Sequence, residues 1–273
     1  MTAFSVEGSG VTLHGDDDGK GAAILLLHGL SATRRYVLHG STALVREGYR
    51  LIAYDSRGHG ESSPAPSPSG YDYATLTSDA MRVLDDRGVE RAVLVGMSMG
   101  AAVAASAALT YPNRVCALVA ITPAHLGTRA ADPARWQRLA AGLETGGADG
   151  FVNAYGDPGV PSASLDLIRT VMRQRMSRHL SPSAVADALR HTPAGAAFDG
   201  EEALCAITCP TLVIGSRDRL DPDHPMRTAE RWAQLIPGAA LMVEDDGQSP
   251  LAWRGGSLSR AIADFLVGIP TEP

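Results

Sequence analysis

The sequence predicts an α/β protein with a mostly parallel central sheet flanked by helices and with a helical cap inserted into it. Three observations lead to this fold class: strand-like runs alternate with helical segments, the runs are continuously apolar, and one long interval contains no strand. Continuous apolar runs favour strands that are covered on both faces, as in a parallel sheet. The predicted strands are residues 23–27, 49–54, 92–95, 117–121, 212–214 and 240–243.

Four helices are predicted to cover the faces of this sheet. A Pro/Ser-rich surface loop at residues 62–70 precedes the first helix, at 73–86. An alanine-rich helix at 101–109 follows the third strand, and helices at 225–235 and 257–266 follow the last two strands.

The interval between the fourth and fifth strands, residues 122–210, is too long for a crossover of one helix. It contains three segments with helical periodicity, two of which begin with an Asp-Pro or Ser-Pro pair typical of a helix start. These segments are residues 132–143, 164–179 and 182–191. We therefore expect an inserted helical cap at 123–204 and a core made of residues 1–122 and 205–273.

The composition restricts the functional classes. The chain has 273 residues with 24 Lys and Arg against 30 Asp and Glu, so its formal net charge is −6. This balance does not offer the basic surface that binds nucleic acid, and the apolar runs are far shorter than the roughly 20 residues of a membrane span. Its first residues lack the basic and apolar regions of a signal peptide. We expect a cytoplasmic monomer or homodimer that acts on a small molecule.

No cofactor or metal is expected. Cys205 and Cys209 form a C-x3-C pair that lacks companion ligands for zinc. The acidic run at residues 16–19 lacks the alternation of a calcium loop, and we expect it to be an exposed turn.

Residues 96–100, Gly-Met-Ser-Met-Gly, lie between the third predicted strand and the alanine-rich helix. A G-x-S-x-G sequence in this place is typical of a nucleophile elbow, whose glycines let the backbone turn sharply and expose the serine hydroxyl. This context favours the elbow over a glycine-rich turn whose serine only caps the helix. Ser98 is therefore the candidate nucleophile, and the N–H of Met99 is a candidate oxyanion donor.

His28, Gly29 and Leu30 follow the first predicted strand. An oxyanion hole requires two N–H groups aimed at one point, and we expect Leu30 to supply the donor that accompanies Met99. His28 is a candidate for substrate contact, although histidines in such a place more often brace the loop through hydrogen bonds.

Residues 55–62, Asp-Ser-Arg-Gly-His-Gly-Glu-Ser, follow the second predicted strand. With the His-Gly loop before it and the elbow after it, the chain resembles the α/β-hydrolase superfamily, in which a D-x-R-G-x-G-x-S stretch stands between those motifs. The resemblance covers roughly residues 20–122 and 205–268. It implies a serine nucleophile, a carboxylate after a later strand and a histidine after the last strand. The 55–62 loop itself is expected to be structural.

The resemblance assigns the remaining two positions of a catalytic triad. Asp218 follows the fifth predicted strand and is the expected carboxylate, with Asp221 and Asp223 as alternatives. Where the family has histidine after the last strand, this chain has Gln248. A neutral carboxamide cannot accept the serine proton, so Gln248 cannot be the base.

These residues predict a serine hydrolase scaffold for a small ester, lactone or related acyl compound, impaired by Gln248. The impairment would come from an engineered inactivating change or from natural loss. Two other functions stay open: a non-hydrolytic enzyme that carries out elimination, cyclisation or rearrangement in the same pocket, and a ligand-binding protein without catalysis.

A histidine from elsewhere in the chain is a further alternative for the base. His125 is the most interesting, because it follows the fourth predicted strand near the carboxyl edge of the sheet. Nothing in the sequence shows that it reaches Ser98. The other histidines, most of which we expect on the surface or in loops, are His14, His28, His39, His59, His179, His191 and His224.

Substrate contacts are expected from the mouth of the site and from the cap. Arg34 and Tyr36 follow the oxyanion loop and can meet a polar or anionic substrate, although adjacent arginines are more often solvated. Trp136 and Tyr155 can line the pocket or pack the cap onto the core. The complete set of candidates is His28, Gly29, Arg34, Tyr36, His125, Trp136 and Tyr155.

Overall fold

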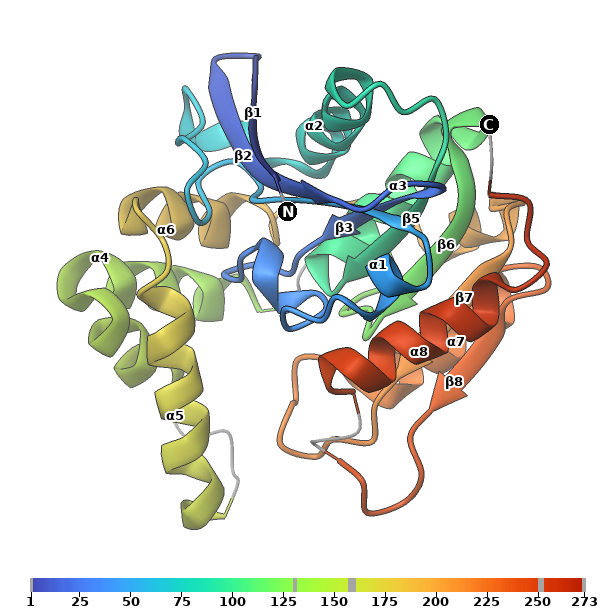
Figure 1. The fold of residues 1–273 in the computed structure, drawn as a ribbon. Coiled ribbons are helices and arrows are strands. Elements are labelled where there is room, and N and C mark those ends of the chain that lie inside the picture. The colour runs from blue at the N-terminus through green and yellow to red at the C-terminus, as the bar shows by residue number, and fades with distance from the viewer. Residues whose placement is uncertain (1, 130–131, 157–160, 250–252, 272–273) are drawn as a thin grey trace.

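Eight strands form one sheet in the computed structural model, which describes residues 2–129, 132–156, 161–249 and 253–271 (Figure 1). Their order across the sheet is β1-β2-β4-β3-β5-β6-β7-β8. The strands β3 to β8 pair in parallel, and the β1–β2 and β2–β4 pairs are antiparallel. The predicted mostly parallel sheet is confirmed. The strands are β1 (Thr2–Gly8), β2 (Val11–Asp18), β3 (Ala23–Leu27), β4 (Arg50–Tyr54), β5 (Ala92–Met97), β6 (Val115–Ile121), β7 (Thr211–Gly215) and β8 (Ala240–Val243).

The antiparallel hairpin of β1 and β2 has no counterpart among the predicted strands. Its buried side chains alternate with less buried ones, as at Phe4 and Val6 in β1 and at Val11 and Leu13 in β2. Alternation is the pattern of a strand with one face in the core. A search for continuous apolar runs therefore detects the central strands and misses this hairpin.

The acidic run at residues 16–19 is not an exposed turn, which corrects the prediction. Its three aspartates are the last residues of β2, and two of them bind arginines. Asp16 accepts a hydrogen bond from Arg34 Nε at 2.6 Å, and Asp17 accepts two from Arg50 at 2.6 and 2.9 Å. The run thus ties β2 to the loop after β3 and to β4.

Alternate residues of the central strands face opposite layers of helices. Leu25 and Leu27 of β3 belong to the core that also contains side chains of α2, α3 and α7. Ile24 and Leu26 belong to the core shared with α1 and α8. This confirms the predicted sheet flanked by helices. The covering helices are α1 (Ala43–Arg46), α2 (Tyr73–Asp86), α3 (Met99–Thr110), α7 (Met226–Leu235) and α8 (Gly255–Leu266), and the short 3-10 helices are η1 (Arg34–Tyr36), η2 (Pro68–Tyr71), η3 (Pro112–Arg114) and η4 (Glu201–Ala206).

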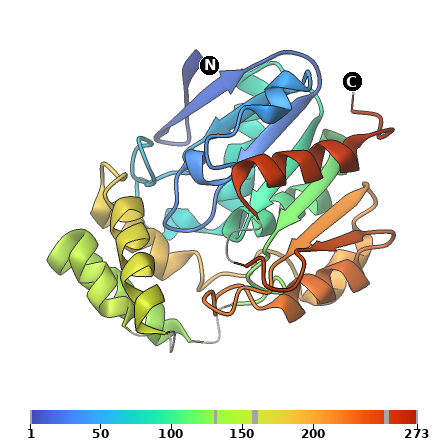
Figure 2. The same ribbon diagram turned by 60° about the horizontal axis from the view of Figure 1, so that its bottom comes forward.

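Three helices between β6 and β7 gather at one side of the sheet in both ribbon views (Figures 1 and 2). They share an apolar cluster of their own, which includes Leu139, Phe151, Met176 and Val185. Leu30, in the loop after β3, packs against this cluster and against the main core, so it lies where the two meet. These helices are α4 (Pro133–Tyr155), which breaks at Gly147, α5 (Ser162–Met176) and α6 (Pro182–His191).

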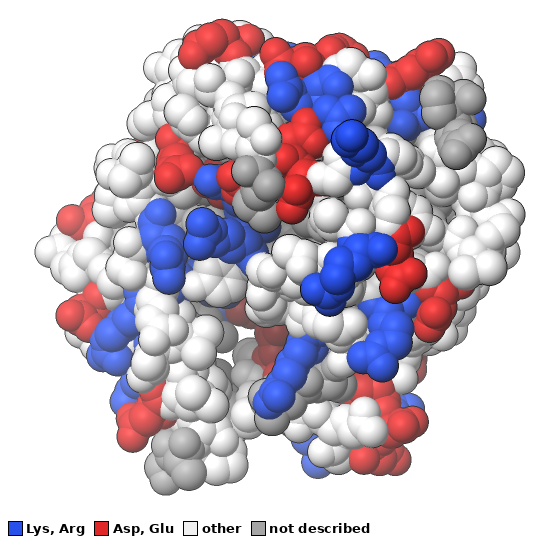
Figure 3. Space-filling model, in the orientation of Figure 1, with Lys and Arg blue, Asp and Glu red and all other residues white. Residues whose placement is uncertain are grey.

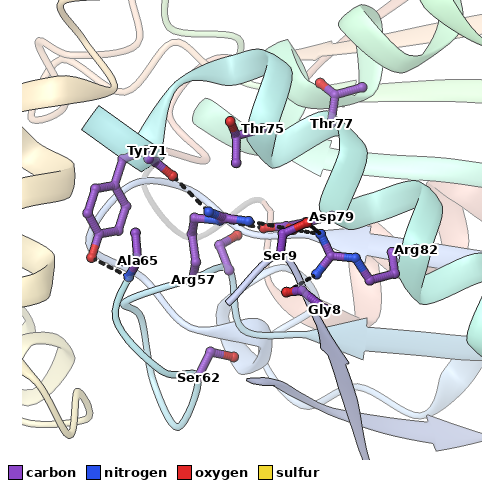
Figure 4. Close-up of polar contacts among 12 residues, drawn as sticks. Gly8, Ser9, Arg57, Ser62, Ala65, Tyr71, Thr75, Thr77, Asp79 and Arg82 are labelled. Carbon is purple, nitrogen blue, oxygen red and sulfur yellow. Dashed lines mark hydrogen bonds and ion pairs between the residues drawn. The ribbon is translucent and has the colours of Figure 1, made fainter. Parts of the chain in front are cut away.

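A buried ion pair anchors the 55–62 loop to α2 (Figure 4). Arg57 donates from Nε and Nη2 to the two carboxylate oxygens of Asp79 at 2.7 and 2.8 Å, and from Nη1 to the carbonyl of Gly70 at 3.1 Å. Arg82 also donates to Asp79, at 2.8 Å. A fully hydrogen-bonded buried pair of this kind fixes the loop in place, in agreement with the structural role expected for it.

Candidate active site

Ser98 occupies the sharp turn between β5 and α3. Its backbone is held at φ 55° and ψ −113°, a conformation that residues with a side chain rarely adopt. The turn is tight enough to require glycine on both sides. A Cβ at Gly96 would lie 2.1 Å from the carbonyl oxygen of Gly100, and a Cβ at Gly100 would lie 2.0 Å from that of Leu27. The strand–turn–helix context expected of the elbow is therefore present around Ser98.

His224 is the hydrogen-bond partner of the Ser98 hydroxyl. Its Nε2 lies 2.7 Å from Ser98 Oγ, and its Nδ1 lies 2.7 Å from Oδ2 of Asp221. Both residues belong to the loop between β7 and α7. The carboxyl ends of parallel strands meet at one edge of a sheet, so this loop reaches the turn that follows β5. A hydroxyl, an imidazole and a carboxylate in this order can move the hydroxyl proton to the imidazole.

Asp221 is held as a carboxylate behind His224. Burial acts to raise its pKa, but the hydrogen bond from His224, the N–H of Asp223 and the charge of Arg175 outweigh burial and lower that pKa. The Asp223 N–H donates to Oδ1 at 3.2 Å, which leaves Oδ2 for the imidazole. With Nδ1–H donating to Asp221, Nε2 is free to accept from Ser98.

His224 was not a specific candidate from the sequence, and Asp221 was ranked below Asp218. The available signal was the Asp-x-x-His spacing of Asp221 and His224 in a loop at the same sheet edge as Ser98. The family pattern instead places the histidine after the last strand.

Asp218 and Gln248, expected at the acid and histidine positions of the triad, form no hydrogen bond with Ser98 or His224 in the described part of the chain, which corrects the prediction. Asp218 accepts from the backbone N–H of Leu220 at 2.9 Å, and burial raises its pKa. Gln248 is exposed, and its side-chain nitrogen lies 3.4 Å from Oδ2 of Asp245. The imidazole that is hydrogen-bonded to Ser98 therefore comes from the β7–α7 loop and not from the loop that carries residue 248.

Glu244 joins the loop after β8, which carries Gln248, to the loop after β7. Its buried carboxylate accepts from the hydroxyl of Ser216 at 2.8 Å and from the N–H of Arg217 at 2.7 Å, and it also binds the hydroxyl of Ser249. Burial acts to raise its pKa, but these donors hold the pKa of Glu244 below its ordinary value. Glu244 was not among the candidate residues from the sequence.

His125, the preferred substitute base in the sequence analysis, is bound elsewhere. Its Nε2 lies 2.8 Å from the hydroxyl of Tyr73, and its Nδ1 accepts from the N–H of Gly127 at 3.0 Å. Nδ1 is therefore the unprotonated nitrogen and Nε2 the donor to Tyr73. Burial lowers the pKa of His125 to about 4, so it is a neutral group that fixes the start of the segment after β6.

His28 is one of three buried histidines that connect the loops around the site. His28 donates from Nδ1 to the carbonyl of Gly29 at 2.8 Å and accepts from the N–H of Ser56 at 2.9 Å. Rings of His28 and His59 have centroids 5.2 Å apart, and those of His59 and His179 are 5.5 Å apart. These contacts support the alternative in which His28 braces the loop through hydrogen bonds.

The proposed oxyanion donors lie on the two segments that flank Ser98. Met99 is the first residue of α3, where helix N–H groups have no acceptor within the helix. Gly29 stands next to the serine: a Cβ there would lie 3.3 Å from Ser98 Cβ and 3.7 Å from Oγ. Leu30 is the next residue in the chain, so the loop that carries its N–H runs beside the nucleophile.

Arg34 is not available at the mouth of the site. Its Nε and Nη2 bind Asp16 and Glu61 at 2.6 and 2.7 Å, and its Nη1 binds Asp55. Every nitrogen of the guanidinium is engaged in an ion pair, which corrects the prediction that Arg34 contacts substrate. Tyr36, two residues on, is half-buried with its ring centroid 6.4 Å from that of His39.

Trp136 and Tyr155 both belong to α4 and are half-buried. The guanidinium of Arg135 lies between them, 5.2 Å from the Trp136 ring and 5.3 Å from the Tyr155 ring. Arg135 also binds Asp223 in the β7–α7 loop at 2.7 and 2.9 Å. These contacts connect α4 to the loop that carries His224.

Within the described residues, no cluster of three or more His, Cys, Asp or Glu side chains is arranged to hold a metal ion. In the same part of the chain, no helix has the length and apolar character needed to cross a membrane.

Relatives among known proteins share this fold over most of the chain. A family model described as the alpha/beta hydrolase fold matches residues 22–253. A Variovorax paradoxus (strain S110) protein named "Putative carbamate hydrolase RutD" is 30% identical over 272 residues, covering 94% of this chain and 95% of that protein. Epoxide hydrolase A of Mycobacterium tuberculosis is 33% identical over 172 residues, which span 62% of this chain and 52% of that relative.

A solved structure extends the comparison to three dimensions. The structure of Est816, described as an N-acyl homoserine lactone degrading enzyme, has a TM-score of 0.75 at 27% identity, covering 96% of this chain and 99% of that one. The resemblance noted in the sequence is confirmed by these matches. The chain belongs to the alpha/beta hydrolase fold family and is a hydrolase-type enzyme.

Proposed function

We propose that the protein is a catalytically competent serine hydrolase of small esters, lactones or related acyl compounds. Ser98 is the nucleophile, His224 the general base and acid, and Asp221 the carboxylate that orients His224. The observation that carries the proposal is the chain of two 2.7 Å contacts from Ser98 Oγ through His224 to Asp221. Such a chain is the geometric signature of an activated serine.

In the proposed reaction Ser98 Oγ attacks the carbonyl carbon of the substrate while His224 Nε2 takes the hydroxyl proton. The N–H groups of Leu30 and Met99 stabilise the negative oxygen that forms. His224 then gives the proton to the leaving alcohol oxygen as the C–O bond breaks, and the acyl group stays on Ser98. Water attacks that acyl group with His224 again as base, which releases the acid and restores the serine.

A serine nucleophile favours acyl substrates over epoxides. Attack on an acyl carbon gives an ester with Ser98 that water can cleave by the same route, whereas attack on an epoxide would give an ether that the route cannot cleave. Support also comes from two similar proteins, one named a putative carbamate hydrolase and one described as a lactone-degrading enzyme, since carbamates and lactones both contain a carbonyl carbon.

The three helices α4 to α6 fit the role of a cap at 123–204 in this proposal. They carry their own apolar cluster, and two of their contacts lead to the site: Leu30 packs against that cluster, and Arg135 binds Asp223. In this proposal, Gln248 is a loop residue that takes no part in catalysis. The main argument for an impaired enzyme or a purely ligand-binding protein was the lack of a base. In this proposal that argument no longer holds, because a base lies next to Ser98.

A labelling experiment tests the proposal without knowledge of the natural substrate. A fluorophosphonate phosphonylates a serine whose proton is taken by a neighbouring base, with fluoride as the leaving group. We expect the wild type and Gln248→Ala to add one label at Ser98 at equal rates, measured by intact-mass spectrometry. His224→Ala should label at least about 100-fold more slowly, the usual scale of general-base catalysis.

Ser98→Ala is the control, because it must stay unlabelled. Equal labelling rates for His224→Ala and the wild type would contradict the proposed base. A label on another residue would contradict the proposed nucleophile.

A further inference from the structure

Arg175 on α5 has a buried nitrogen without a partner. Its Nε is the only buried side-chain nitrogen or oxygen within the described residues that makes no hydrogen bond. The buried guanidinium groups of Arg34 and Arg57, by contrast, each bind carboxylates. Leaving a buried polar group unpaired is unfavourable, and more so for a charged one. An unpaired donor of this kind in a native fold calls for an explanation.

The guanidinium of Arg175 lies in the neighbourhood of the proposed catalytic residues. It interacts electrostatically with Asp221 and Asp223 of the β7–α7 loop and with Tyr36 and Tyr155. Burial disfavours its charged form and lowers its pKa, although these four groups act in the opposite direction. Arg175 is thus a half-buried cation beside the loop that holds His224.

The nearby carboxylates do not satisfy the donors of Arg175. Asp223 binds Arg135 through both of its oxygens, at 2.7 and 2.9 Å. Asp221 uses Oδ2 for His224 and Oδ1 for a backbone N–H. No hydrogen bond or ion pair joins Arg175 to either residue in the part of the chain that the structure describes.

The surface is hollowed at this place. Figure 3 shows a depression between α5 and the loops that follow β7 and β8, with acidic side chains visible inside it. These elements are the ones that contribute Arg175, Asp221 and His224. A ligand in this depression would lie between α5, the helix that carries Arg175, and the β7–α7 loop.

We propose that Arg175 binds a carboxylate of the substrate, so that the compound hydrolysed at Ser98 is an ester or lactone that carries a second, anionic group. This inference rests on the proposed function and names its substrate class. A guanidinium offers a planar set of N–H donors that pairs with a carboxylate through two parallel hydrogen bonds. Because Nε itself is closed to solvent, the substrate carboxylate would bind end-on, through the two terminal nitrogens of this half-buried side chain.

Matched esters of one diacid test the proposal. Monomethyl glutarate keeps one free carboxylate, and dimethyl glutarate has none, while the ester bond to be cleaved is the same. We expect the wild type to have the higher kcat/KM on the monoester. Arg175→Gln should raise KM for the monoester by about 10- to 100-fold, the range of a hydrogen bond to a charged group. Its kinetics on the diester should stay within about threefold of the wild type.

Arg173→Gln is the control variant, because Arg173 lies on the same helix and is exposed, with an ion pair to Asp149. It should behave as the wild type on both esters. Arg175→Lys should recover part of the monoester preference, because it keeps the charge and loses the planar pair of donors. Circular dichroism and thermal melting of each variant show whether it is folded.

A binding measurement separates this inference from the proposed function. Glutarate itself should raise the melting temperature of the wild type and of Arg173→Gln with increasing concentration, and not that of Arg175→Gln. Equal losses of turnover on both esters in Arg175→Gln would show an effect through Asp221 and overturn the carboxylate site. Equal stabilisation of all three proteins by glutarate would also overturn the carboxylate site, and so would a lack of stabilisation in all three. If Ser98 is never labelled by the fluorophosphonate, the proposed function fails, and the glutarate result still decides the role of Arg175.

Discussion

His224, the proposed base, stands three residues beyond the carboxylate that it contacts, so acid and base come from one loop. By position along the family pattern, Asp218 was the expected acid, and Gln248, which cannot act as a base, occupied the place of the histidine. A position in the chain is a weak guide here, because several loops converge at the carboxyl edge of a parallel sheet and any of them can place a side chain next to Ser98. Hydrogen-bond geometry, and not chain order, identifies the set.

Ser98 itself was predictable because the constraint on it is local. The backbone atoms that approach Gly96 and Gly100 belong to the turn itself or to the adjacent strand. The five-residue sequence therefore carries the information. The partner of Ser98 depends on contacts across 126 residues of sequence, and no local pattern encodes a contact of that range.

At the residue scale, the two candidate carboxylates make opposite predictions. Asp221→Asn should lower kcat by about 10³- to 10⁴-fold, because an amide NH₂ in place of the carboxylate favours the wrong tautomer of His224. Asp218→Asn should change kcat by less than about threefold, since its contact to the N–H of Leu220 needs only one acceptor oxygen. Steady-state hydrolysis of p-nitrophenyl acetate by both variants measures this, and the reverse order of effects would restore Asp218 as the acid.

At the scale of elements, three neutral histidines hold the loops around the site together. His59 accepts from the N–H of Ser31 at 3.2 Å, and His179 accepts from the N–H of Gly60 at 2.9 Å while donating to the carbonyl of Ser31 at 3.1 Å. His179 follows α5, so it links that helical segment to the loops after β3 and β4. The role of His28, His59 and His179 could not be predicted from the sequence. Their hydrogen bonds either join segments at least 28 residues apart or depend on the conformation of the loop that carries the histidine.

These histidines predict a loss of stability in acid. Burial lowers the pKa of His28 and His179 to about 4 and that of His59 to about 3, against 6.5 for the ordinary group. At pH values between these lowered pKa values and 6.5, the unfolded chain binds more protons than the folded one. Stability is therefore complete above pH 6.5 and is lost as the pH falls toward 4. A shift of this size corresponds to on the order of 3 kcal/mol for each histidine.

His179→Gln tests this account, because glutamine can accept from Gly60 and donate to Ser31 without titrating. Urea unfolding at pH 7.5 and at pH 5 gives the loss of stability on acidification for each protein. The variant should lose less than the wild type, and any packing cost of the substitution cancels in the difference between the two pH values. An equal or larger loss in the variant would contradict a neutral His179.

At the scale of the whole molecule, the sequence predicted the strands that are continuous apolar runs, and all six correspond to β3 through β8. Five of them lie in the interior of the sheet, and β8 is an edge strand whose residues are exposed or half-buried. The β1–β2 hairpin at the sheet edge has an alternating pattern and was missed. Helix α4 extends to Tyr155 past the predicted end at residue 143, because the helix resumes after its break at Gly147.

The site draws on most of this architecture. Ser98 follows β5, His224 and Asp221 follow β7, Leu30 follows β3, and Arg175 comes from the helices between β6 and β7. The order of these strands brings β3, β5, β6 and β7 side by side. The fold was therefore a sound basis for locating the site, while the choice among the loops at its edge required the side-chain contacts.

The central claim is that His224, and not the residue at position 248, is the base for Ser98. The most direct test is kcat/KM on p-nitrophenyl acetate for wild type, His224→Ala, Gln248→Ala and Gln248→His, prepared side by side. We predict that His224→Ala loses at least about 10⁴-fold and that both Gln248 variants stay within about threefold of the wild type. An inactive wild type that gains several-thousand-fold in Gln248→His, with no effect of His224→Ala, would contradict the account.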